Sequence, residues 1–74
     1  MIARMRRMGS EEAMRLLRKN GFVEKRQTGS HLIFFHPVSR LTVPVPVGRK
    51  DLPIGTLRSI LKGAGLLDHE EKDT

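Results

Sequence analysis

The segment from Leu41 to Val47 constrains the fold most, because it alternates apolar residues with prolines. Leu41, Val43, Val45 and Val47 would point to one side of a strand, and Thr42, Pro44 and Pro46 to the other. Residues two apart in a strand direct their N–H groups to the same edge, so the two prolines remove the donors of one edge only. The pattern predicts an outer strand of a sheet, with one apolar face that needs a covering layer.

A helix is predicted over Ser10 to Asn20. Ser10 is a favoured N-cap residue, and Gly21 is suited to the positive φ that follows many helix ends. The residues expected to point inward are Ala13, Met14, Leu16 and Leu17. The basic residues Arg15, Arg18 and Lys19 lie on another side, where they either follow an RNA backbone or form a solvated face.

Two short strands are predicted next, Phe22 to Arg26 and His31 to His36, joined by a turn over residues 27–30. Alternation along the second strand places His31, Ile33 and Phe35 on one face and Leu32, Phe34 and His36 on the other. All three phenylalanines, Phe22, Phe34 and Phe35, lie in apolar runs, which favours core positions over platforms for stacking bases.

A second helix is predicted to start at Leu52-Pro53 and to end at Gly65. Its inward stripe is Ile54, Leu57, Ile60, Leu61 and Ala64. The order is therefore helix, three antiparallel strands, helix, an α+β arrangement. The simplest two-layer solution packs both helices on one face of the three-stranded sheet.

The charge of the chain indicates an anionic partner. The 74 residues carry 14 Lys and Arg against 8 Asp and Glu, a net charge of +6. Four of the acids lie in residues 68–74, so residues 1–67 hold 13 basic and 4 acidic side chains, a difference of +9. This is typical of a protein that binds nucleic acid or an acidic protein. We divide the chain into a flexible basic arm (1–9), one domain (10–67) and an acidic disordered tail (68–74).

The composition argues against several other classes. The chain has no cysteine, hence no disulfide, thiol nucleophile or Cys-bound zinc, which suits the cytoplasm. Its longest apolar run, Leu32 to Phe35, is too short to span a membrane. Residues 1–67 hold few carboxylates for a two-metal site, and there is no helix-turn-helix spacing that would indicate a DNA-binding protein. We expect no metal, no small-molecule cofactor and no membrane partner.

Several motifs occur in a specific order. Gly29-Ser30-His31 opens an apolar strand, His36-Pro37 closes it, the Val-Pro strand follows, and the run from Lys50 to Lys62 leads to Ala64-Gly65. Together they resemble the HicA family of bacterial toxins over residues 10–67. The resemblance implies a fold like the double-stranded-RNA-binding domain, ribosome-independent cleavage of messenger RNA (mRNA), and neutralisation by a HicB-like antitoxin. Neither the basic arm nor the acidic tail belongs to it.

His31 is the candidate catalytic residue. Attack of a ribose 2′-OH on the adjacent phosphate needs a general acid or base, which histidine supplies near neutral pH. His69 lies in the tail, and His36 lies on the opposite strand face, so the two strand histidines are not expected to act as a pair. An isolated strand histidine is also commonly a structural or surface residue. The resemblance places the family's catalytic histidine at His31, which favours a single-histidine, metal-independent mechanism.

Six further residues are candidates for binding RNA: Gly29, Ser30, Arg49, Lys50, Thr56 and Arg58. Gly29 suits a positive φ or a close phosphate, and Ser30 either donates to phosphate or bonds the turn. Thr56 lies near a helix start that attracts anions, although a capping threonine among solvated charges is the alternative. Two other functions stay open: a non-catalytic RNA-binding module of the same fold, and a component kept only for assembling a complex.

Overall fold

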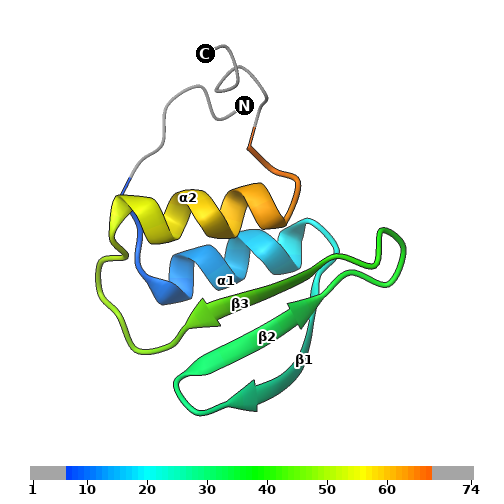
Figure 1. The fold of residues 1–74 in the computed structure, drawn as a ribbon, viewed down its shortest axis with the longest axis horizontal. Coiled ribbons are helices and arrows are strands. Elements are labelled where there is room, and N and C mark those ends of the chain that lie inside the picture. Colours follow the sequence, from blue (N-terminus) through cyan, green and yellow to red (C-terminus); the bar gives the residue numbers. More distant parts are fainter. Residues whose placement is uncertain (1–6, 68–74) are drawn as a thin grey trace.

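The computed structural model describes residues 7–67. Its elements are α1 (Ser10–Lys19), β1 (Val23–Thr28), β2 (His31–Phe35), β3 (Thr42–Pro46) and α2 (Ile54–Gly63). Both helices pack on one face of a three-stranded antiparallel sheet, as predicted (Figure 1). The predicted boundaries differ by one or two residues, and each helix ends, as expected, before a glycine of positive φ, Gly21 or Gly65. The acidic tail and His69 lie outside the described residues.

β3 forms an edge of the sheet, in the order β1-β2-β3, as the prolines predicted. Val45 of β3 lies opposite Leu32 of β2 in the antiparallel register. The N–H of Val47 donates to the carbonyl of Ser30 at 2.9 Å. Odd-numbered residues of this segment therefore direct their N–H groups toward β2, and Pro44 and Pro46 occupy the free edge, where no donor is lost from the ladder.

The core lies between the sheet and the helices. Nine of its twelve buried apolar residues in the described range lie in the helices and strands: Ala13, Met14 and Leu17 in α1, Phe34, Val43 and Val45 in the sheet, and Leu57, Ile60 and Leu61 in α2. Two residues predicted to point inward are exposed, Leu41 at 39% and Ile54 at 43%. Leu41 immediately precedes β3 and Ile54 is the first residue of α2, so the apolar stripe extends past the layer that it faces at both positions.

The second face of the sheet has no helix over it within residues 7–67 (Figure 1). Phe35 is on this face and only half-buried, and the cationic groups of Lys25 and Arg40 lie 5.2 and 5.8 Å from its ring centroid. The core prediction is therefore confirmed for Phe22 and Phe34 and wrong for Phe35. Alternation along β2 carries Phe35 to the open face, where cations cover the ring instead of a helix.

The start of α1 also differs from the prediction. Gly9 is the N-cap, and Ser10 is the first helical residue and only 1% exposed. The Ser10 hydroxyl donates to the carbonyl of Pro46 at 2.6 Å and accepts from the N–H of Arg49 at 3.0 Å. The N-cap prediction for Ser10 is wrong, because the hydroxyl joins α1 to the end of β3 and the loop beyond it.

Candidate functional site

One end of the molecule collects the candidate residues. Figure 1 shows the β1–β2 turn, the end of β3 and the starts of both helices at this end. His31 begins β2 and pairs in register with Pro46. Arg49 and Lys50 lie in the loop after β3, and Thr56 lies in the first turn of α2. The fold thus brings together three segments that are separate in the sequence.

Gly29 and Ser30 form the two-residue turn between β1 and β2, since Thr28 pairs with His31. Gly29 has a φ of +57°, and Ser30 does not have a positive φ, which is the φ pattern of a type II′ hairpin turn. A Cβ added at Gly29 would meet no atom within 4 Å. Within the described structure the turn conformation, rather than crowding, therefore accounts for glycine at this position.

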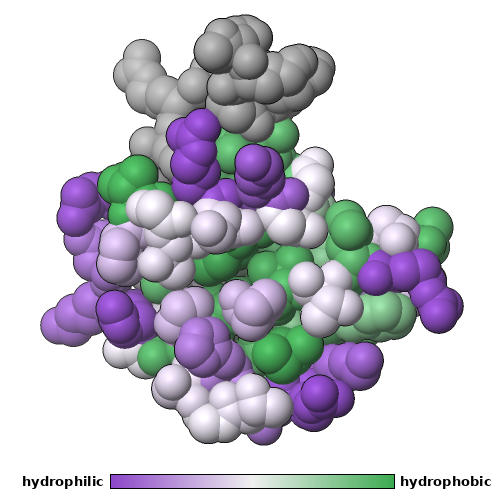
Figure 2. All heavy atoms as spheres, in the orientation of Figure 1, coloured by the Kyte–Doolittle hydropathy of each residue, from purple (hydrophilic) through white to green (hydrophobic). Residues whose placement is uncertain are grey.

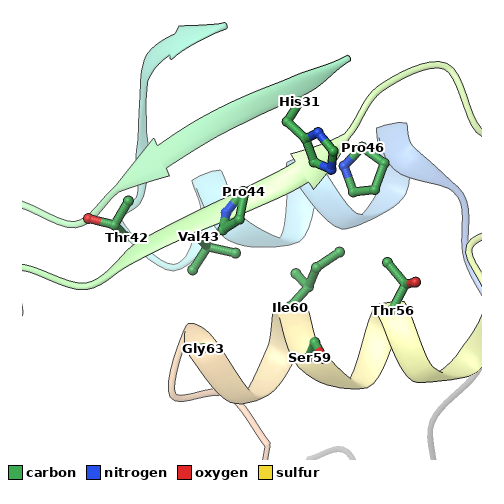
Figure 3. A pocket seen from close by; sticks show the side chains of 9 residues that line it. All are labelled: His31, Thr42, Val43, Pro44, Pro46, Thr56, Ser59, Ile60 and Gly63. Carbon is green, nitrogen blue, oxygen red and sulfur yellow. The ribbon is translucent and has the colours of Figure 1, made fainter. Parts of the chain in front are cut away.

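His31 is exposed and borders a cavity between β3 and α2 (Figure 3). The cavity has a volume of about 150 Å³ and is lined by His31, Thr42, Val43, Pro44, Pro46, Thr56, Ser59, Ile60 and Gly63. In Figure 3 the His31 ring lies beside Pro46, and Thr56 lies across the cavity on α2. Among residues 7–67, none forms a hydrogen bond with the His31 imidazole, so both ring nitrogens are available to a ligand.

His36, by contrast, is part of the folded framework. Its Nδ1 accepts hydrogen bonds from the backbone N–H groups of Val38 and Ser39, both at 3.1 Å. Its ring meets the buried ring of Phe22 edge-on, with the centroids 5.0 Å apart. His36 therefore lies on the core side of the sheet, opposite His31 as predicted, and its Nδ1 is occupied. Of these two histidines, His31 is the one whose ring nitrogens are both available for proton transfer.

The first backbone N–H groups of α2 have no acceptor among residues 7–67. Pro53 is its N-cap without a side-chain cap, and its first turn holds no acidic residue. The first turn of α1, in comparison, contains Glu11 and Glu12, which already offset the helix dipole there. An anion is consequently favoured at the start of α2, where Thr56 adds a hydroxyl that borders the same cavity as His31.

The basic loop is held by the start of α1. The N–H of Ser10 donates to the carbonyl of Arg49 at 2.9 Å, which adds to the two bonds of the Ser10 hydroxyl. Gly9 packs so closely that an added Cβ would lie 2.4 Å from the carbonyl oxygen of Lys50. The side chains of Arg49 and Lys50 remain exposed. The backbone of the loop is fixed while its cationic groups stay accessible to phosphate.

Residues 7–9, which the sequence placed in the basic arm, also contact this loop. Leu52 donates its N–H to the carbonyl of Met8 at 2.9 Å. The guanidinium of Arg7 donates to the carboxylate of Asp51 at 2.8 Å, and this hydrogen bond raises the pKa of Arg7 above its usual range. These three residues are therefore joined to the domain, whereas the rest of the predicted arm, residues 1–6, lies outside the described residues.

Arg58 is exposed and does not border the cavity. It follows Thr56 by two positions, which is a rotation of about 200° around the helix, so the two side chains leave α2 on different sides. The sequence reasoning missed Ser59 and Gly63, which do border the cavity. They follow Thr56 at i+3 and i+7, so the three residues lie on one face of α2 that carries only small or polar side chains. This spacing was the sequence pattern from which the lining of the cavity could have been predicted.

Within residues 7–67, no three His, Cys, Asp or Glu side chains lie close enough to hold a metal ion. No helix in the same range is long and apolar enough to cross a membrane.

A family model described as the HicA toxin of bacterial toxin–antitoxin systems matches residues 10–66, which is 57 of the 74 residues. A comparison with curated proteins found no match. The matched range contains both helices, all three strands and every residue that lines the cavity.

Proposed function

The chain belongs to the HicA toxin family of bacterial toxin–antitoxin systems, and from this premise we propose that it cleaves mRNA in the cytoplasm, without the ribosome and without a metal ion. In this proposal His31 is the general acid or base, and a HicB-like antitoxin neutralises the protein. One observation carries it: an exposed imidazole with no hydrogen-bond partner among residues 7–67 shares a cavity with the uncapped start of α2.

The chemistry proposed for His31 is proton transfer during attack by the ribose 2′-oxygen. His31 takes the proton of the 2′-OH as that oxygen bonds to the phosphorus, or donates a proton to the 5′-oxygen as the P–O5′ bond breaks. Either step needs an imidazole that can reach the RNA, which the exposure of His31 allows. The products are a 2′,3′-cyclic phosphate and a 5′-hydroxyl.

The phosphate that reacts would lie at the start of α2. Backbone N–H groups of the first turn and the hydroxyl of Thr56 would stabilise the extra negative charge that develops on it. Arg49 and Lys50, on the adjacent loop, would hold neighbouring phosphates of the RNA. Gly29 and Ser30 would let the RNA backbone approach the β1–β2 turn. Arg58 lies on another side of α2, and we still predict that it contacts a phosphate farther along the RNA.

Cleavage of a single-stranded RNA in the presence of EDTA tests the mechanism. His31→Ala should abolish cleavage while the affinity for an RNA with a 2′-deoxy linkage at the cleavage site stays nearly unchanged. Thr28→Ala is the matched control, because Thr28 is exposed and pairs with His31 across the same turn. Loss of cleavage in EDTA, or an unchanged rate in His31→Ala, would contradict the mechanism. If the parent protein and His31→Ala both bind RNA and neither cleaves it, the chain is a non-catalytic RNA-binding module.

The proposed partner is an acidic protein that covers this end of the molecule. Arg49 and Lys50 are exposed beside the site, so an acidic surface would be oriented toward His31 by charge, while apolar contact would supply the lasting affinity. Addition of the partner should block RNA cleavage. A complex that cleaves RNA as fast as the free protein would show that the partner binds elsewhere.

A further inference from the structure

The cavity beside His31 extends well beyond the phosphate-binding start of α2. We propose that it is a pocket for one nucleobase of the RNA, adjacent to the phosphate that reacts, and that its side chains determine the sequence preference of cleavage. This inference rests on the proposed function. We call the part of the cavity that is lined by β3 and α2 the base pocket; its lining residues are Thr42, Val43, Pro44, Pro46, Thr56, Ser59, Ile60 and Gly63.

The shape and surface of the base pocket suit a flat, partly apolar ring. The whole cavity, including its His31 end, has a volume of about 150 Å³, which leaves room for one planar ring system of the size of a nucleobase. Buried Val43 and Ile60 line it, together with the rings of Pro44 and Pro46 at the free edge of β3. Figure 2 shows hydrophobic surface between α2 and the sheet, bordered by more polar side chains. An apolar hollow with a few polar groups is typical of sites for small organic rings.

Three residues that line the base pocket carry a hydroxyl group: Thr42, Thr56 and Ser59. None of these hydroxyls has a hydrogen-bond partner among residues 7–67. The buried hydroxyl of Ser10, by contrast, is fully used by the fold. A hydroxyl can donate and accept. Thr56 lies at the phosphate end of the pocket, so the hydroxyls of Ser59 and Thr42 are the ones available to the donors and acceptors of a base.

Gly63 supplies a separate observation. It lies in the last turn of α2 without a positive φ, and an added Cβ would meet only Val43 Cγ2 at 3.8 Å, an ordinary contact. The fold would therefore accept alanine here, and alanine is about 1 kcal/mol more favourable than glycine inside a helix. The packing of the fold does not account for the glycine. The absence of a side chain does leave this end of the base pocket open.

The position of the base pocket relative to His31 determines which base it would hold. In Figure 3, His31, Pro46 and Thr56 lie at one end of the pocket, and Thr42 and Gly63 lie at the other. A phosphate at the first end directs an attached nucleoside along the groove between β3 and α2. The occupant is therefore a nucleotide next to the cleaved linkage, and its base lies toward Gly63.

Titration of the full-length protein with each of the four ribonucleoside 5′-monophosphates tests binding independently of cleavage. We expect one nucleotide to bind more tightly than the others and to shift the NMR signals of Thr42, Ser59 and Gly63. Inorganic phosphate should shift only the start of α2 and its surroundings. If nucleotides and inorganic phosphate shift the same signals, the base pocket does not exist as proposed.

Two substitutions connect the pocket to specificity. Gly63→Leu fills it and should weaken binding of the preferred nucleotide about tenfold or more, and Ser59→Ala should change the base preferred in a cleaved pool of random RNA. Lys62→Leu is the matched control, since it places the same side chain in the same last turn of α2, and Lys62 is exposed and does not line the pocket. Thermal unfolding of each variant shows whether it is folded. An unchanged cleavage pattern in folded Gly63→Leu would overturn the inference, whereas nucleotide binding without RNA cleavage would leave the pocket intact and refute the catalytic proposal alone.

Discussion

Ser10→Ala is the substitution that best tests how the basic end of the molecule is held together. Ser10 is only 1% exposed, and its hydroxyl bonds the carbonyl of Pro46 and the N–H of Arg49, at 2.6 and 3.0 Å. Alanine keeps the backbone bond from residue 10 to Arg49 but leaves both of these groups without their partner. An unsatisfied buried group costs about 1–3 kcal/mol, so two partly buried ones should cost about 2 kcal/mol or more.

A loss of that size is large for a domain of this length. One kcal/mol corresponds to about 4–8 °C in the Tm of a domain of 60–100 residues, so Ser10→Ala should unfold at least about 8 °C below the parent protein. Circular dichroism during heating measures the transition, and hydrogen exchange at the amide of Arg49 reports on the loop. Faster exchange there is expected, together with weaker RNA binding.

Ser39→Ala is the matched control for this measurement. Ser39 lies in an exposed turn, and its hydroxyl accepts one long bond, 3.4 Å, from the N–H of Leu41. Its removal should change the free energy of unfolding by no more than about 0.5 kcal/mol. If Ser10→Ala unfolds within about 4 °C of the parent, as the control should, the hydroxyl of Ser10 does not hold the loop and the reasoning is refuted.

Three further predictions concern stability, RNA affinity and the partner. Gly9→Ala places a Cβ 2.4 Å from the carbonyl oxygen of Lys50 and should destabilise the fold by about 1–3 kcal/mol in thermal unfolding, whereas Gly55→Ala, which adds a Cβ in open space, should not. Lys50→Gln should reduce the slope of log Kd for RNA against log salt concentration by roughly one unit, and an unchanged slope would assign Lys50 to a solvated surface. Expression of the chain alone should arrest growth, whereas expression of His31→Ala should be harmless. His31→Ala should still bind the acidic partner, and a partner concentration of 100 times the Kd of the complex should stabilise it by about 2.7 kcal/mol. Failure of His31→Ala to bind would place His31 at the centre of that interface.

Local patterns in the sequence determined the elements and much of their orientation. The alternation in residues 41–47 identified β3 as an edge strand, and the prolines face the free edge as expected. The same rule placed His31 and His36 on opposite faces of the sheet, because neighbouring side chains in a strand alternate. These features depend on residues two to four positions apart, which is why periodicity alone could predict them.

Tertiary structure decided which of these side chains are occupied by the fold and which are available. Ser10 bonds residues 36 and 39 positions away, and the helix-start pattern could not distinguish this role from an N-cap. His36 is held by a turn and the ring of Phe22, whereas His31 borders a cavity that exists only because α2 lies beside the proline edge of β3. No local pattern encodes these distances, since they depend on how two helices and a sheet pack around one shared core.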